Sequence, residues 1–114
     1  EAKLGIAYQQ AGKYRLSSEH YTKALQIARD LGMKRDEAET LHNLAIVLAC
    51  LGRNEESIQV IRQGRDIFAT LHDEQGMARN TYHLAFGLAR EENTDLDEAL
   101  SLGNQALEIF QKHQ

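Results

Sequence analysis

Hydrophobic residues recur every three or four positions along most of the chain, which is the period of an α-helix. There is no sustained alternation of polar and apolar residues and no Asn-Gly or Asp-Gly turn, so strands and hairpins are not indicated. The pattern therefore predicts an all-α protein with helices at about 1–11, 15–31, 35–50, 54–71, 75–90 and 96–112.

The helical pattern returns after 40 residues. The first helix of each copy carries leucine at the same place, at Leu4, Leu44 and Leu84. The second half of the third copy runs two residues late, so Ser57 meets Ala99, and we expect the extra residues near 91–94. A period of this length is typical of an α-solenoid. We expect one domain over 1–114 with three stacked helix pairs, as repeats at about 1–33, 34–73 and 74–114.

Small residues recur where two helices must cross closely, because the distance between helix axes follows the size of the side chains at the contact. These positions are Gly5, Ala45 and Ala85 on the first helices and Ala24, Gly64 and Ala106 on the second. Large residues are expected to fill the remaining space: Leu4, Tyr8, Tyr21, Leu25, Leu44, Leu48, Ile61, Leu84, Leu88, Leu107 and Phe110. Gly103 stands where a large residue is expected, which predicts a loosely packed third copy.

The order Leu4-Gly5-x-x-Tyr8, Gly12-x-Tyr14, Ser17-x-x-x-Tyr21-x-x-Ala24 resembles the tetratricopeptide repeat. The 40-residue period and the missing closing proline are similar to the repeats of polarity and G-protein-regulator scaffolds and of some signalling sensors. This resemblance implies stacked helix pairs that bind protein and are not an enzyme.

The composition of the chain excludes several classes of function. Hydrophobic residues make up 42% and charged residues 26% of the 114 residues, as in a soluble globular domain. A net charge of -4 argues against non-specific nucleic-acid binding, which needs many cations. No apolar run is long enough to span a membrane. The single cysteine, Cys50, fits a reducing compartment, so a cytoplasmic location is expected. Because the chain begins inside a helical pattern without methionine, we expect a piece of a longer protein.

Candidate chemistry is sparse. Glu39-x-x-His42 puts a carboxylate and an imidazole on one helical face, but di-iron bundles need two such motifs. His42 and His83 fall on successive first helices and are expected to be near each other. Two imidazoles alone are a poor zinc site. We expect no catalytic residues, metal or cofactor, and interpret both histidines as lining a groove.

The resemblance implies that the first helix of each pair lines a concave groove. Helical spacing then predicts three lines of residues across it: an apolar line of Ile6, Ile46 and Phe86, a polar line of Lys3, Asn43 and His83, and a third line of Gln10, Cys50 and Arg90. Glu39, His42, Arg79 and Tyr82 are expected beside them. An apolar stripe with polar borders suits a peptide. The alternative is that Ile6, Ile46 and Phe86 pack between neighbouring helices.

We therefore expect a module that binds a peptide or protein segment. Lys3, Arg79 and Arg90 favour a ligand with acidic residues. The alternative is an architectural segment of a larger assembly or signalling sensor, with a homodimer formed through its uncapped terminal helices.

Overall fold

The computed structural model describes residues 1–90 and 96–113, and every element in these ranges is helical. The helices are α1 (Ala2–Gln10), α2 (Tyr14–Asp30), α3 (Lys34–Cys50), α4 (Asn54–Thr70), α5 (Glu74–Ala89) and α6 (Leu96–Lys112). Each begins and ends within one residue of the range predicted from the sequence. The predicted all-α class is confirmed, while the expected insertion near 91–94 lies outside the described residues.

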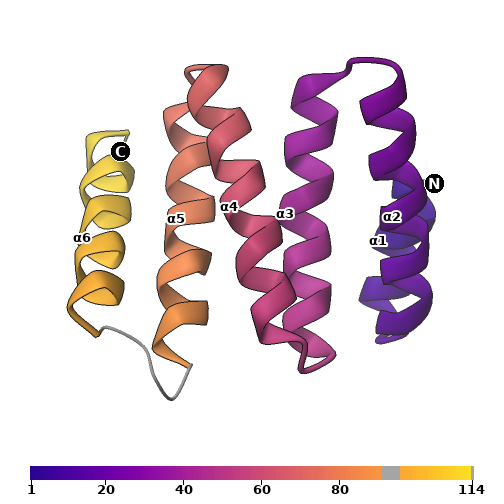
Figure 1. The fold of residues 1–114 in the computed structure, drawn as a ribbon, viewed down its shortest axis with the longest axis horizontal. Helices are drawn as coiled ribbons and strands as arrows, with labels where there is room; N and C mark the ends of the chain where they lie inside the picture. Colours follow the sequence, from indigo (N-terminus) through magenta and orange to yellow (C-terminus); the bar gives the residue numbers. More distant parts are fainter. Residues whose placement is uncertain (91–95, 114) are drawn as a thin grey trace.

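The helices stand side by side along the long axis, from α1 and α2 at one end to α6 at the other (Figure 1). Each helix contacts the next one along the chain, and the molecule measures 36 × 32 × 24 Å. Each pair of helices therefore packs only against its neighbours, as expected for an α-solenoid.

Turns between the helices depend on left-handed backbone conformations. Gly12, Gly32 and Gly52 have φ between 68° and 78°, which is the usual way to end a helix. His72, 40 positions after Gly32, adopts the same conformation with φ 58°. The next residue, Asp73, accepts a hydrogen bond from the Gly76 amide at 2.9 Å and so caps α5.

The predicted small residues lie where the helices cross. A Cβ atom on Gly5 would come within 2.7 Å of the Tyr21 ring, so α1 reaches α2 only because this residue is glycine. The Ser17 hydroxyl donates to the Gly5 carbonyl at 2.7 Å, and Ser57 donates to the Ala45 carbonyl at the same distance. The same contact thus recurs in successive pairs.

The core consists of two clusters, one around Tyr21 and Leu41 and one around Ile61 and Leu84. Two predicted core residues are exceptions: Leu4 is 48% exposed and Leu107 is 51% exposed. Both lie on terminal pairs, where a neighbouring pair covers only one side. The prediction that they fill the core was wrong because it assumed a neighbour on both sides.

Candidate functional site

Two clefts run between the first helices at the α1 end of the stack. One of about 430 Å³ is lined by α1, α2 and α3, and one of about 450 Å³ lies beside it. Ile6 and Asn43 line both, and Glu39 lines the first. Gln10 and Cys50 line the second. The structure therefore brings Ile6 and Gln10 of α1 together with Glu39, Asn43 and Cys50 of α3.

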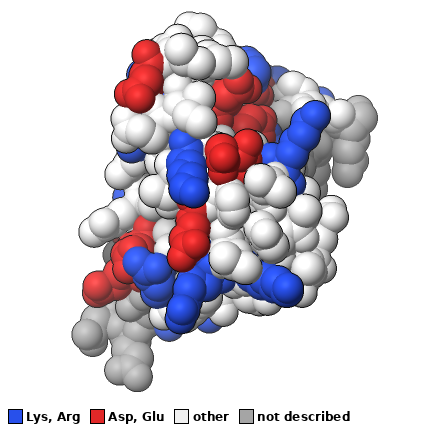
Figure 2. Space-filling view, turned by 90° about the vertical axis from the view of Figure 1, so that its right-hand side faces the viewer, with Lys and Arg blue, Asp and Glu red and all other residues white. Residues whose placement is uncertain are grey.

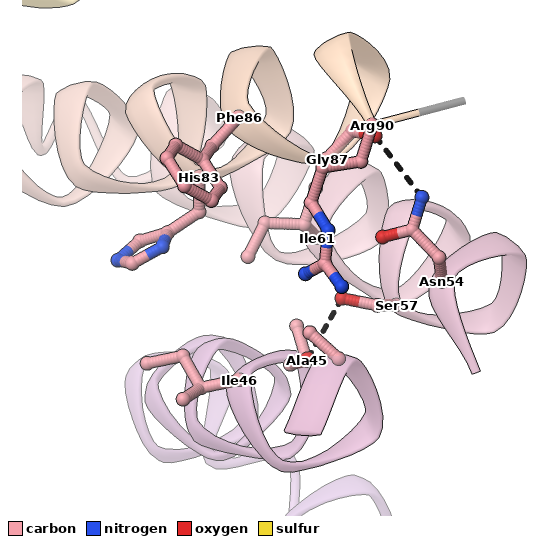
Figure 3. A pocket seen from close by; sticks show the side chains of 10 residues that line it. Ala45, Ile46, Asn54, Ser57, Ile61, His83, Phe86, Gly87 and Arg90 are labelled. Carbon is pink, nitrogen blue, oxygen red and sulfur yellow. Dashed lines mark hydrogen bonds between the residues drawn. The ribbon is translucent and has the colours of Figure 1, made fainter. Parts of the chain in front are cut away.

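A smaller pocket of about 50 Å³ lies where α5 meets α3 and α4. Four predicted site residues line it: Ile46, His83, Phe86 and Arg90. The Arg90 side chain extends from α5 into this pocket toward Ser57 (Figure 3). The Asn54 side chain donates to the Gly87 carbonyl at 3.0 Å and closes the pocket on the α4 side.

The apolar line Ile6–Ile46–Phe86 is accessible to solvent. Ile6 is 41% exposed, Phe86 is 60% exposed and Ile46 is half-buried. Because core residues of these types are normally covered, this exposure favours a surface stripe over packing between helices.

His42 does not line the groove, which corrects the sequence interpretation. It is buried in the contact between α3 and α5, and its Nδ1 lies 2.6 Å from the Asn80 Oδ1. Since an amide oxygen only accepts, Nδ1 carries the hydrogen. Asn80 is fully buried. Helical spacing on α3 alone could not reveal that a polar partner on the next repeat covers His42.

The two histidines form a close pair, as predicted. The His42 and His83 rings meet edge to face with centroids 5.0 Å apart. Burial lowers the pKa of His42 below its usual value, and the hydrogen bond that its Nδ1 donates to Asn80 only partly opposes this shift. Burial also lowers the pKa of His83, and the positive charge that His42 and Arg79 can carry acts in the same direction. Both imidazoles are therefore favoured in the neutral form at pH 7.

The charges of the site are more balanced than the sequence suggested. Arg79 Nη2 lies 3.1 Å from Glu39 Oε1, so this pair joins α5 to α3. Within residues 1–90 and 96–113, Lys3 and Arg90 make no ion pair. At the α1–α2 end, basic and acidic residues are interspersed on the surface (Figure 2). Arg79 is thus already paired with Glu39, so it contributes less net positive charge to the site than the sequence suggested.

Other predicted residues lie at the margins of these clefts. Lys3 is exposed but lines neither cleft at the α1 end. Tyr82 is 47% exposed and belongs to a further cleft between α5 and α6. Asn54 and Ser57 were missed because both lie on the second helix of their pair. The resemblance directed attention only to the first helices.

The structure is that of an α-solenoid with clefts between the first helices of its pairs. The family profile described as tetratricopeptide repeat matches residues 1–70 and 36–112. The chain therefore belongs to the tetratricopeptide repeat family, as the sequence motif predicted. Repeats of this family generally mediate protein–protein interaction and are typically scaffolds, not enzymes.

Among solved structures, the chain is similar to BtubC (BKLC) from P. vanneervenii, with a TM-score of 0.85 and 24% identity. The match covers 97% of this chain and 44% of that one. At this identity the similarity shows the fold alone. The comparison with curated proteins gives no match. In the described residues, no helix has the length and apolar character that crossing a membrane requires.

Proposed function

We propose that the first helices of the three pairs bind a peptide segment of a partner protein, with its apolar side chains against Ile6, Ile46 and Phe86. The observation that carries this proposal is the exposure of these residues beside the clefts of α1, α3 and α5. Covering them would remove apolar surface from water, which is the main favourable contribution to most protein association.

Polar groups beside the apolar line would fix the position of the peptide. Asn43 borders both clefts at the α1 end, where its amide can donate to and accept from a peptide backbone. At the α5 end, Arg90 lines the pocket beside Phe86. An acidic side chain of the ligand fits best at this end, because Glu1, Asp36 and Glu39 make the α1 end acidic.

The proposal can be tested by selecting peptides from a displayed random library on the wild-type chain. Binding of the selected peptides is then measured on the double variant Ile6→Ser, Ile46→Ser and on the control Leu31→Ser. Leu31 is 67% exposed, lies in the turn after α2 and lines neither cleft at the α1 end. We expect the double variant to lose about tenfold or more in affinity, while the control keeps it.

Circular dichroism of the double variant distinguishes the two interpretations of these isoleucines. A wild-type helical signal with weakened binding supports the groove. A collapse of the helical signal, or unchanged affinity for every selected peptide, would refute it.

A further inference from the structure

Two cavities of the groove occupy equivalent positions in successive repeats. One is the cleft of about 450 Å³ between α1, α2 and α3, and the other is the pocket of about 50 Å³ between α3, α4 and α5. All but one of the residues that line the first have a counterpart 40 positions later in the second, beginning with Ile6 and Ile46. The two cavities are therefore the same site built twice from different side chains, and their differences show what each can bind.

The two cavities differ in size because α3 carries shorter side chains than α5. Asn43 and Cys50 of α3 line the first, where α5 carries His83 and Arg90 in the second. The long Arg90 side chain extends across its pocket toward Ser57 (Figure 3). Because Cys50 is much shorter, the first cleft has room for a large side chain of a ligand, whereas the second accepts only a small group.

The two cavities also differ in charge. The second contains Arg90 and His83. Among the described residues that line the first, none is acidic or basic. A charged side chain bound in the first cleft would lose hydration without gaining an opposite charge, which is unfavourable. The first cleft therefore favours a neutral side chain.

Three side-chain amides give the first cleft its polar character, and we call it the amide cleft. The Tyr21 hydroxyl donates to Gln9 Oε1 at 2.7 Å, so the Gln9 amide nitrogen keeps its hydrogens for another partner. The side chains of Gln10 and Asn43 make no hydrogen bond to residues 1–90 or 96–113. Since an amide both donates and accepts, the cleft suits a group that does both.

Apolar surface lies beside these amides. Ile6 is 41% exposed, and the half-buried Tyr14 also lines the cleft. A large side chain with an apolar ring and a hydroxyl matches both kinds of surface, and this combination is that of tyrosine. Phenylalanine has no group for the amides, and the indole of tryptophan donates but does not accept.

We propose that the amide cleft binds a tyrosine side chain of the partner's peptide segment. The proposal rests on the peptide function proposed above and adds to it the residue that the α1–α3 end selects. Residues 6–50 alone line this cleft, and both of the helix pairs that form it are present in the stack.

Peptides from the displayed random library test the proposal directly. Peptides that bind the wild-type chain should be enriched in tyrosine at one position. Replacing this tyrosine by phenylalanine in a synthetic peptide should weaken binding about fivefold, as expected for one lost hydrogen bond. Replacing it by lysine should weaken binding about tenfold or more, because the cleft offers the ammonium no carboxylate.

Exchanging the side chains that differ between the two cavities locates the tyrosine. The double variant Asn43→His, Cys50→Arg gives the amide cleft the side chains of its neighbour. It should bind the tyrosine peptide about tenfold or more weakly, because the arginine fills the space and brings a charge. A new selection on this variant should enrich acidic residues in place of tyrosine.

Two further variants control for charge and folding. Gln59→Arg adds the same charge at an exposed position of α4 that lines neither cavity, and it should leave the affinity unchanged. If circular dichroism shows that the double variant does not fold, Cys50→Arg alone replaces it, since Cys50 is exposed.

The outcomes separate this proposal from the peptide function on which it rests. Selected peptides that need Ile6 and Ile46 but show no enriched tyrosine would overturn the tyrosine site alone. Equal binding of the tyrosine and lysine peptides, or full affinity for the double variant, would do the same. If no peptide is selected, or if binding survives Ile6→Ser, Ile46→Ser, both proposals are wrong.

Discussion

The pairs α3–α4 and α5–α6 have equivalent positions along the repeat but differ in what covers them. The seam between the two helices of the middle pair is covered by α5, whereas among the described residues nothing covers the equivalent seam between α5 and α6, a cleft of about 370 Å³. Ile61 is 2% exposed on the middle pair, and Gly103 stands in its place on the last. Equivalent positions of a repeat can therefore differ in solvent exposure, because the surroundings of each one depend on the next helix in the stack.

The largest expected difference in stability between the two helix pairs concerns two equivalent phenylalanines, Phe68 on α4 and Phe110 on α6. Phe68 is fully buried and its ring contacts Gly76 of α5, while Phe110 on α6 is only half-buried. We expect Phe68→Ala to cost about 3–5 kcal/mol of unfolding free energy and Phe110→Ala about 1–2 kcal/mol. Urea denaturation of both variants measures the difference.

Leu31→Ala is the control for this pair, since its side chain is 67% exposed and its loss should change stability little. Equal costs for Phe68→Ala and Phe110→Ala would contradict the claim that the two seams differ in coverage.

The fold could be predicted from the sequence because it depends on local periodicity. The spacing of Leu4, Leu44 and Leu84 predicts the length of the repeat. The small residues Gly5 and Gly64 predict the helix crossings that the structure shows. Helix ends could be placed as well, because turn glycines such as Gly52 precede a new apolar pattern. These signals require no knowledge of which pairs of helices are neighbours in space.

The candidate site could be predicted only in part, because it depends on contacts between repeats. Ile6 and Phe86 are exposed, as a surface line requires, while their part in binding stays a prediction. The buried state of His42 was not, since it depends on Asn80 from the next pair. The pairing of Arg79 with Glu39 was missed for the same reason, although the two residues lie one repeat length apart. Oppositely charged residues 40 positions apart are the signal that could have revealed it.

His42 lies on α3 and His83 on α5, so this pair makes the contact between the middle and the last helix pair sensitive to pH. Burial holds the pKa of each imidazole below its unfolded value, so the unfolded chain takes up protons first as the pH falls. The stability is therefore complete above pH of about 6.5 and decreases as the pH falls below it. Arg79 and Glu39 are the charged groups that act on His42, and Arg79 also disfavours protonation of His83.

We expect the melting temperature to fall between pH 7.5 and pH 5.5, because the pKa values of both buried histidines are held below their unfolded value. The variant His83→Gln should reduce this fall, because it removes one titrating group and the repulsion between two imidazolium rings. A fall of the same size in the variant would show that other groups cause it. His72→Gln is the matched control, since His72 is exposed in the turn before α5.

The smallest expected effects, of opposite sign, come from two helical glycines. A Cβ atom on Gly64 would come within 2.7 Å of the Asn80 Nδ2, so Gly64→Ala must displace the buried amide that holds His42. We expect it to cost about 1 kcal/mol or more. Gly103→Ala meets only an ordinary contact and should stabilise α6 by about 0.5–1 kcal/mol, because alanine favours helix. Urea denaturation gives both signs, and stabilisation by Gly64→Ala would mean that the covered seam is as open as the uncovered one.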